Sequence, residues 1–363
     1  MAPLKARSSV VKQNFASHFS QQRAQAYSDT TSSRGASSHN IRSIGWNPQG
    51  SLIATGAADK TLRVCECTSL TPNGILMEDL TRVKGNPEKP NVRFSTELKG
   101  HAAPIEKVAF NPVKDAELCS VSNDGVVKFW DVRTKACVNE VKGLGEAFTL
   151  AWHPEGESLI VGTKSDKIHI LSPTQSTPLA SHQQSVQTNQ ISFCWSGNKV
   201  FVSTGEGKVR ILSYPDLQPL MHYNYDRSKI DGTGATDEYM MKGHTSSCLS
   251  VELSPNARYL ASGGTDSMIC LWDTQDWICQ QSFTDMVGPV KSLSFTWDGF
   301  YVVGGSDEGT GIECYHCESG ERVHTFKTAS PSPVVSWAPT RYHLAYSDLG
   351  QLRIVAADVP DRK

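Results

Sequence analysis

Cysteine pairs are the residues in this 363-residue chain whose spacing could support chemistry. Cys314 and Cys317 are separated by two residues, and Cys65 and Cys67 by one. A structural zinc site needs about four ligands, usually from two such pairs at a suitable spacing. Neither pair has a second ligand pair at such a spacing, so we expect these cysteines to pack in the protein interior rather than to bind a metal. Most other cysteines lie singly in strand-like runs, which fits a reducing compartment.

The sequence also lacks the common catalytic motifs. The sequence contains no GxSxG, P-loop or HExxH pattern. Histidine and aspartate are plentiful, but most of them fall at turns or at positions with a structural explanation. We therefore expect a protein that is not an enzyme and that uses no cofactor, no metal and no small-molecule substrate.

Bulk composition is that of a globular protein, with 38% hydrophobic and 20% charged residues. The net charge of −2 gives no overall attraction to nucleic acid or membrane. No apolar run approaches the roughly 20 residues of a membrane helix, and the first residues have no signal-peptide core. We expect a cytosolic or nuclear protein.

One phrase recurs along the chain: a β-rich run, an aromatic residue or leucine, and a turn rich in Pro, Gly, Asn and Asp. Its anchor residues are 64, 42, 41, 60, 42 and 42 residues apart, so four gaps agree and two are longer. The seven anchors are Trp46, Phe110, Trp152, Phe193, Leu253, Phe295 and Trp337.

Each repeat contains short alternating runs such as "KTLRV" and "VVKFWD", separated by tight turns. Alternation and turn chemistry favour short antiparallel strands over helix. Four strands in each of seven repeats predict an all-β protein, a seven-bladed β-propeller with four antiparallel strands per blade.

The second and fifth repeats resemble those of WD-repeat proteins. "GHAAPIEKVAFNPVKDAELCSVSNDGVVKFWDVR" and "GHTSSCLSVELSPNARYLASGGTDSMICLWD" both begin with Gly-His and carry Trp-Asp near the end. In that family a hydrogen-bonded tetrad locks each regular blade, and histidine bridges a half-buried aspartate to a serine. The resemblance implies two tetrads here: His101, Ser120, Asp124 and Trp130, and His244, Ser262, Asp266 and Trp272. Other repeats depart from this pattern and must rely more on packing.

We expect residues 1–39 to form a basic, serine-rich tail ahead of a propeller at residues 40–363. Residues 1–42 contain six Lys or Arg residues against only Asp29. In WD-repeat rings the N-terminal segment usually supplies the last strand, so the resemblance implies a ring-closing strand within residues 13–28. The segment "QQRAQAYS" could equally be helical. The rest of the tail is expected to be solvated or to contact RNA weakly.

Residues 221–244 account for the longer gap between the fourth and fifth repeats. They are polar and glycine-bearing, which predicts a surface loop between two blades. This loop is either a tolerated solvent loop or a partner-binding segment. In the second case Tyr225, Arg227 and Tyr239 are candidates for partner contact.

Residues 65–85 account for the other long gap. Cys65 falls six residues after Asp59, where the second and fifth repeats have tryptophan. Replacing residues 65–85 by one tryptophan shortens the gap to 44 residues, and their codons can contain splice-site-like strings. We therefore hypothesise a retained intron; the alternative is a genuine loop between the third and fourth strands of blade one. An exposed excursion is expected, with the outer strand restarting near "NVRFSTEL".

A closer resemblance rests on "GKVRILSYPDLQPL" in the fourth repeat, which lacks Trp-Asp, and on "GEAFTLAWHPEGESLIVGTKSDKIHI" in the third. Both are similar to the WD-repeat subunits of the THO complex. The resemblance implies a non-catalytic, nuclear interaction scaffold of the THO/TREX complex, which couples transcription to mRNA processing and export. Its partners would be the large helical scaffold subunits of that complex.

The stretch Trp130-Asp131-Val132-Arg133 supports an alternative. It fits the short WDxR element of WD-repeat substrate receptors for cullin-type ubiquitin ligases, which makes Arg133 a candidate partner-binding residue. Asp-x-Arg after a blade tryptophan is common in this fold, so Arg133 could equally cap a surface turn.

Overall fold

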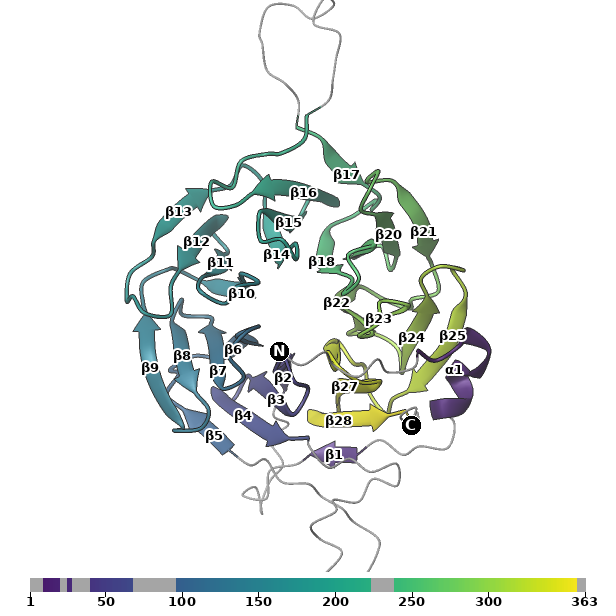
Figure 1. Ribbon diagram of the computed structural model, residues 1–363, viewed down its shortest axis with the longest axis horizontal. Coiled ribbons are helices and arrows are strands. Elements are labelled where there is room, and N and C mark those ends of the chain that lie inside the picture. Colours follow the sequence, from purple (N-terminus) through teal and green to yellow (C-terminus); the bar gives the residue numbers. More distant parts are fainter. Residues whose placement is uncertain (1–8, 20–24, 28–39, 68–95, 223–237, 358–363) are drawn as a thin grey trace, which may run out of the picture.

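The computed structural model describes residues 9–19, 25–27, 40–67, 96–222 and 238–357. In this part of the chain, seven four-stranded antiparallel sheets stand around a common axis as the blades of a β-propeller (Figure 1). The predicted fold class, the number of blades and the number of strands per blade are therefore confirmed. A helix, α1 (Lys12–Phe19), lies beside the ring.

The blades follow one another in chain order around the ring, and four strands in each run from the axis outward. Blade one contains β2 (Ile41–Trp46), β3 (Leu52–Ala57), β4 (Thr61–Glu66) and β5 (Thr96–Lys99). Blade two contains β6 (Ile105–Phe110), β7 (Glu117–Ser122), β8 (Val127–Asp131) and β9 (Ala136–Val141). Blade three contains β10 (Ala147–Trp152), β11 (Leu159–Thr163), β12 (Lys167–Leu171) and β13 (Ala180–Gln183). Blade four contains β14 (Thr188–Phe193), β15 (Lys199–Thr204), β16 (Lys208–Ser213) and β17 (Met240–Lys242).

The last three blades repeat the arrangement, and the seventh takes its outer strand from the N-terminal part of the chain. Blade five contains β18 (Cys248–Leu253), β19 (Tyr259–Gly264), β20 (Ile269–Asp273) and β21 (Cys279–Phe283). Blade six contains β22 (Val290–Phe295), β23 (Tyr301–Ser306), β24 (Gly311–His316) and β25 (Arg322–Lys327). Blade seven contains β26 (Val335–Trp337), β27 (His343–Asp348), β28 (Gln351–Ala356) and β1 (Gln25–Tyr27).

The hydrophobic core is divided among the blade interfaces. Buried apolar side chains form seven clusters, and each cluster lies between two neighbouring blades. Between blades one and two, for example, Leu62 and Leu98 pack with Phe110 and Trp130. Successive side chains of a strand point to opposite faces of its sheet. Each blade therefore buries both faces only when it has a neighbour on either side, and the ring must close.

Strand β1 closes the ring. Gln25, Ala26 and Tyr27 pair antiparallel with Ile354, Arg353 and Leu352 of β28. The pairing covers the outer edge of β28 and joins the two ends of the propeller, and it falls within the predicted range of residues 13–28. The closing strand is thus confirmed, and residues 25–27 are extended rather than helical.

Helix α1 was not predicted from the sequence. Phe15 and Phe19 lie four residues apart, so they share one face of the helix. Both are buried in the cluster between blades six and seven, where the ring of Phe15 lies 4.1 Å from that of Tyr301. The tyrosine hydroxyls of Tyr301 and Tyr342 also bond the backbone of Val10. Residues 9–19 are therefore docked on the ring rather than solvated.

Strand β4 runs through the start of the predicted insertion in blade one. Cys65 pairs with Ile53, and Cys65 and Cys67 are both buried between blades seven and one. The expected exposed excursion therefore does not begin at Cys65, because this thiol is part of a blade interface. Residues 68–95 lie outside the described residues, and the retained intron stays a hypothesis. The outer strand β5 begins at Thr96, within the predicted "NVRFSTEL" segment.

Residues 221–244 are not a connection between blades, as the sequence pattern had suggested. Met240–Lys242 form β17, the outer strand of blade four, and His222 bridges to Glu238 just before it. The insertion is therefore between the third and fourth strands of blade four. A three-residue strand is too short to show alternation, which explains the error. Residues 223–237, including Tyr225 and Arg227, lie outside the described residues.

Replacing Phe15 with alanine tests whether α1 belongs to the folded ring. An isolated eight-residue helix is marginal in water, so its stability must come from packing. We expect Phe15→Ala to lower the free energy of unfolding by about 3–5 kcal/mol in urea denaturation. Val11→Ala is the matched control, because Val11 is 62% exposed and its loss should cost under about 0.5 kcal/mol. Equal midpoints for the two variants would show that α1 is not docked.

Candidate functional site

The two faces of the ring differ in which turns they carry. Neighbouring strands are antiparallel, so the turns from first to second strand and from third to fourth strand lie on the same face. We call this the lower face. The other turns, from second to third strand and from one blade to the next, form the upper face.

Blade five contains a complete hydrogen-bonded tetrad near the upper face. His244 Nδ1 lies 3.1 Å from Asp266 Oδ1, and His244 Nε2 lies 2.8 Å from Ser262 Oγ. The indole of Trp272 donates to the same Ser262 Oγ at 2.8 Å. The Asp266 carboxylate also accepts the backbone N–H of Thr245. Both ring nitrogens of His244 therefore tie the connection before β18 to β19 and to the turn between β19 and β20.

Blade two contains only three members of its expected tetrad. His101 Nε2 lies 2.7 Å from Ser120 Oγ, which also accepts the indole N–H of Trp130 at 2.8 Å. Asp124 does not join them, in contrast to the expectation from sequence. It is exposed and accepts instead the hydroxyl of Ser122 at 2.5 Å. The Nδ1 atom of His101 is buried without a hydrogen-bond partner among the described residues.

A single position explains the difference between the two blades. Blade five has Gly264 two residues before its aspartate, and blade two has Ser122 there. A Cβ atom at Gly264 would lie 2.4 Å from Asp266 Oδ1 and 2.6 Å from His244 Nδ1. A glycine here lets histidine and aspartate meet, whereas a serine blocks the approach and offers its own hydroxyl.

Burial also changes the protonation of His101. Burial away from water and the nearby Lys128 ammonium together lower the pKa of His101 to about 4, although Asp124 and Glu140 oppose the change. The imidazole is therefore neutral at physiological pH. His101 works as a structural hydrogen-bonding group rather than as a charged one.

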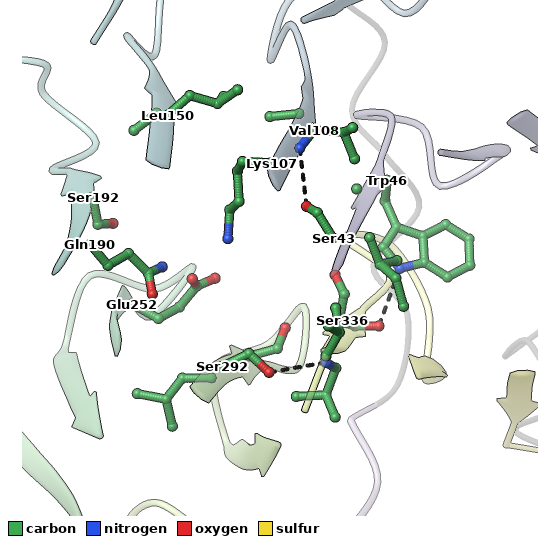
Figure 2. Close-up of a pocket in the computed structure, with 18 of the residues that line it drawn as sticks. Ser43, Trp46, Lys107, Val108, Leu150, Gln190, Ser192, Glu252, Ser292 and Ser336 are labelled. Atoms are coloured by element: carbon green, nitrogen blue, oxygen red, sulfur yellow. Dashed lines mark hydrogen bonds between the residues drawn. The ribbon is translucent and has the colours of Figure 1, made fainter. Parts of the chain in front are cut away.

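The inner strands of the blades enclose a central cavity of about 1040 Å³. Figure 2 shows Lys107 of blade two, Gln190 of blade four and Glu252 of blade five extending into it toward one another. Burial raises the pKa of Glu252 to about 7, against the effect of Lys107, and lowers the pKa of Lys107. The two opposite charges offset one another, which explains how the ring tolerates ionisable groups near its axis.

The lower face carries most of the exposed large apolar side chains in the described part of the chain. Two others, Val287 and Leu349, lie on the upper face. Residues in turns do not alternate with a period of two. The strand pattern of the sequence therefore could not predict that these exposed apolar side chains gather on the lower face. The lower-face side chains are Val113, Leu179, Trp195, Leu220, Ile278 and Phe300.

The predicted partner-binding residues lie in different settings. Arg133 is 79% exposed in its side chain and caps a turn, since its N–H and guanidinium both bond Asp131 and thereby lower the pKa of that carboxyl. Tyr239 is half-buried and donates its hydroxyl to the carbonyl of Trp277 at 3.2 Å. The structure does not bring Arg133 and Tyr239 together.

The cysteine pairs lie inside blade interfaces. Cys314 and Cys317 are both buried, and burial raises the pKa of each thiol. Burial likewise raises the pKa of Cys65. Within the described ranges, no three His, Cys, Asp or Glu side chains gather where they could hold a metal ion. The same part of the chain contains no helix long and apolar enough to cross a membrane.

Removing each tetrad aspartate should have unequal effects. Asp266→Ala leaves the buried imidazole of His244 without its acceptor and removes the hydrogen bond to the backbone N–H of Thr245, so we expect a loss of about 1–3 kcal/mol in unfolding free energy. Asp124→Ala removes an exposed carboxylate and should cost less than about 0.5 kcal/mol. Urea denaturation of the two variants checks this difference. Equal losses would mean that blade two also contains a complete tetrad.

Acid should destabilise the protein through His101. Its pKa is lowered in the folded state, so the unfolded chain binds a proton that the folded chain excludes between about pH 6.5 and 4. The contribution of neutral His101 to the free energy of unfolding is fully present above about pH 6.5. It falls as the pH approaches 4, by up to about 1.4 kcal/mol per pH unit. His101→Gln should be less stable at pH 7, with a difference from wild type that shrinks toward pH 4. A constant difference across this range, or an NMR titration of His101 near 6.5, would contradict the assignment.

The comparisons with known proteins agree with this geometry. The family profile for the WD domain, G-beta repeat, matches residues 30–66, 93–131 and 236–273. These matches cover the three inner strands of blades one, two and five, and the last two also include the outer strand of the preceding blade, β5 or β17. THO complex subunit 3 of Arabidopsis thaliana is 28% identical over 308 residues, covering 85% of this chain and 86% of that protein. WD repeat-containing protein AAC3 of Dictyostelium discoideum is 28% identical over 306 residues, 84% of this chain and 61% of that protein. The Arabidopsis thaliana guanine nucleotide-binding protein subunit beta is 26% identical over 238 residues, 63% of this chain and 60% of that protein. The chain is therefore a seven-bladed propeller in which three stretches match the WD40 repeat, and it resembles THO complex subunit 3 over most of its length.

Proposed function

We propose that this chain is the WD-repeat subunit of a THO-type complex and works as a non-catalytic interaction scaffold in the nucleus. In this role it joins the assembly that couples transcription to mRNA processing and export. The observation that carries the proposal is the likeness to THO complex subunit 3, which extends across 85% of this chain and 86% of that protein. Likeness over most of the chain argues for a shared role more strongly than likeness in single repeats does.

The use of the polar groups supports a scaffold rather than an enzyme. The imidazole of His244, which could serve as a general base, has both nitrogens bonded within its blade. His101 is buried against Ser120 and Trp130. A rigid ring with loops on two faces offers surfaces for recognition, and functional contacts are commonly carried by such loops.

Contacts of the basic N-terminal residues argue against RNA as the principal partner. Lys12 forms an ion pair with Glu321, and Arg42 forms one with Glu106. Their charges are therefore partly offset within the protein. With a net charge of −2, the chain lacks the electrostatic excess that drives binding to the phosphate backbone.

Affinity purification of the full chain from its own cells, followed by mass spectrometry, tests the proposal. We expect the large THO scaffold subunits to be recovered with it. Arg133→Ala is an informative control. Among the described residues Arg133 bonds Asp131 of its own turn, so its loss should leave this recovery unchanged. The opposite outcome is that wild type recovers a cullin adaptor in place of THO subunits and that Arg133→Ala no longer recovers the adaptor. This result would establish the ubiquitin-ligase alternative and contradict the proposal.

A further inference from the structure

Three exposed apolar side chains on the lower face lie along the boundary between blades four and five. Trp195 is 54% exposed, Leu220 is 42% exposed and Ile278 is 62% exposed. We call these three residues the blade four–five patch. Exposed tryptophan and aliphatic side chains at a surface are typical of protein contact sites, because burying them on binding is favourable.

Hydrogen bonds across the boundary hold the patch in place. The indole N–H of Trp195 in blade four donates to the carbonyl of Ser254 in blade five at 2.8 Å. Tyr239 binds Met221 through its backbone N–H and Trp277 through its hydroxyl, at 2.8 and 3.2 Å. Leu220 precedes Met221 and Ile278 follows Trp277, so the Tyr239 contacts link the two segments that carry Leu220 and Ile278 at the outer end of this boundary. Trp195 lies at its inner end, in the turn between β14 and β15. The patch is therefore built on rigid turns.

Acidic side chains surround the patch on the lower face. Among the described residues, the lower-face turns of blades three to six carry six exposed carboxylates: Glu155, Glu157, Asp216, Asp276, Glu318 and Glu321. Lys12 pairs with Glu321 and offsets its charge. Arg258, an exposed base in the described part of these turns, lies 3.7 Å from Glu318 and offsets its charge. A partner with basic groups beside its apolar ones would be attracted to such a rim.

The turns also determine the form of the partner. Their backbone groups bond within the blades, for example Gly197 N–H to Cys194 and Trp277 N–H to Asp273. The patch thus presents side chains rather than a free strand edge, which disfavours addition of a β-strand. An amphipathic helix presents apolar residues at positions i, i+3, i+4 and i+7 and can place Lys or Arg on both flanks.

We propose that the blade four–five patch docks a basic amphipathic helix of a scaffold subunit, with the helix's apolar stripe over Trp195, Leu220 and Ile278. The basic flanks of the helix face the acidic rim. This inference rests on the proposed function for the identity of the partner and adds the surface and the chemistry of the contact.

Binding of purified variants to recombinant THO scaffold subunits tests this docking site. Trp195→Ala and Ile278→Asp should each weaken binding at least tenfold. Glu155→Lys combined with Glu157→Lys should weaken it severalfold, with a loss that shrinks at high salt. Val287→Ala and Glu206→Lys on the upper face are the matched controls and should stay within twofold of wild type. Unchanged melting temperatures show that each variant is folded.

The outcomes separate this inference from the proposed function. If wild type binds and the patch variants bind equally well, the docking site is wrong and the proposed function stands. If wild type fails to bind the scaffold subunits, the proposed function fails and the partner assigned here fails with it. Tighter binding by the Glu155→Lys, Glu157→Lys variant would contradict the proposal that the docked helix has basic flanks. Self-association that Trp195→Ala abolishes, without an effect on scaffold binding, would assign the patch to a second copy of this chain and overturn the proposal.

Discussion

Burial between neighbouring blades is the interaction on which the rest of the structure depends. Each apolar cluster is shared by two sheets, so no blade in the described ring completes a core alone. Closing the ring is therefore a condition for stability of all blades. The chain meets this condition by returning its N-terminal segment to the last blade, where β1 pairs with β28.

The closing seam between blades seven and one is lined by smaller side chains than the next seam. Its buried cluster contains Cys65, Cys67 and Ala345 among aliphatic residues, with Trp46 partly buried beside it. The cluster between blades six and seven contains several aromatic rings and receives Phe15 and Phe19 from α1. Strand β1 and helix α1 thus reinforce the region of the ring where the two ends of the propeller meet.

The fold was predictable from the sequence because its signals repeat. Alternation, turn residues and a period near 42 residues each occur many times, so errors in one repeat do not change the blade count. Helix α1 has one short amphipathic face and no repeat to support it, and β17 has three residues. Both lack a periodic signal. The tetrads were half predictable: residue types at the right spacing located them, but the contact in blade two depends on whether Ser122 or a glycine leaves space for the imidazole.

The surface that we propose for partner binding could not be read from strand patterns, because turn residues have no periodicity. Trp195 and Ile278 come to the same blade boundary only when blades four and five are placed side by side. Hydrogen exchange of the full chain, with and without the THO scaffold subunits, measures this surface directly. We predict slower exchange in the lower-face turns at residues 195–198, 216–222 and 276–278, with no change in the upper-face turns. Protection confined to the upper face, or no protection on binding, would contradict the account.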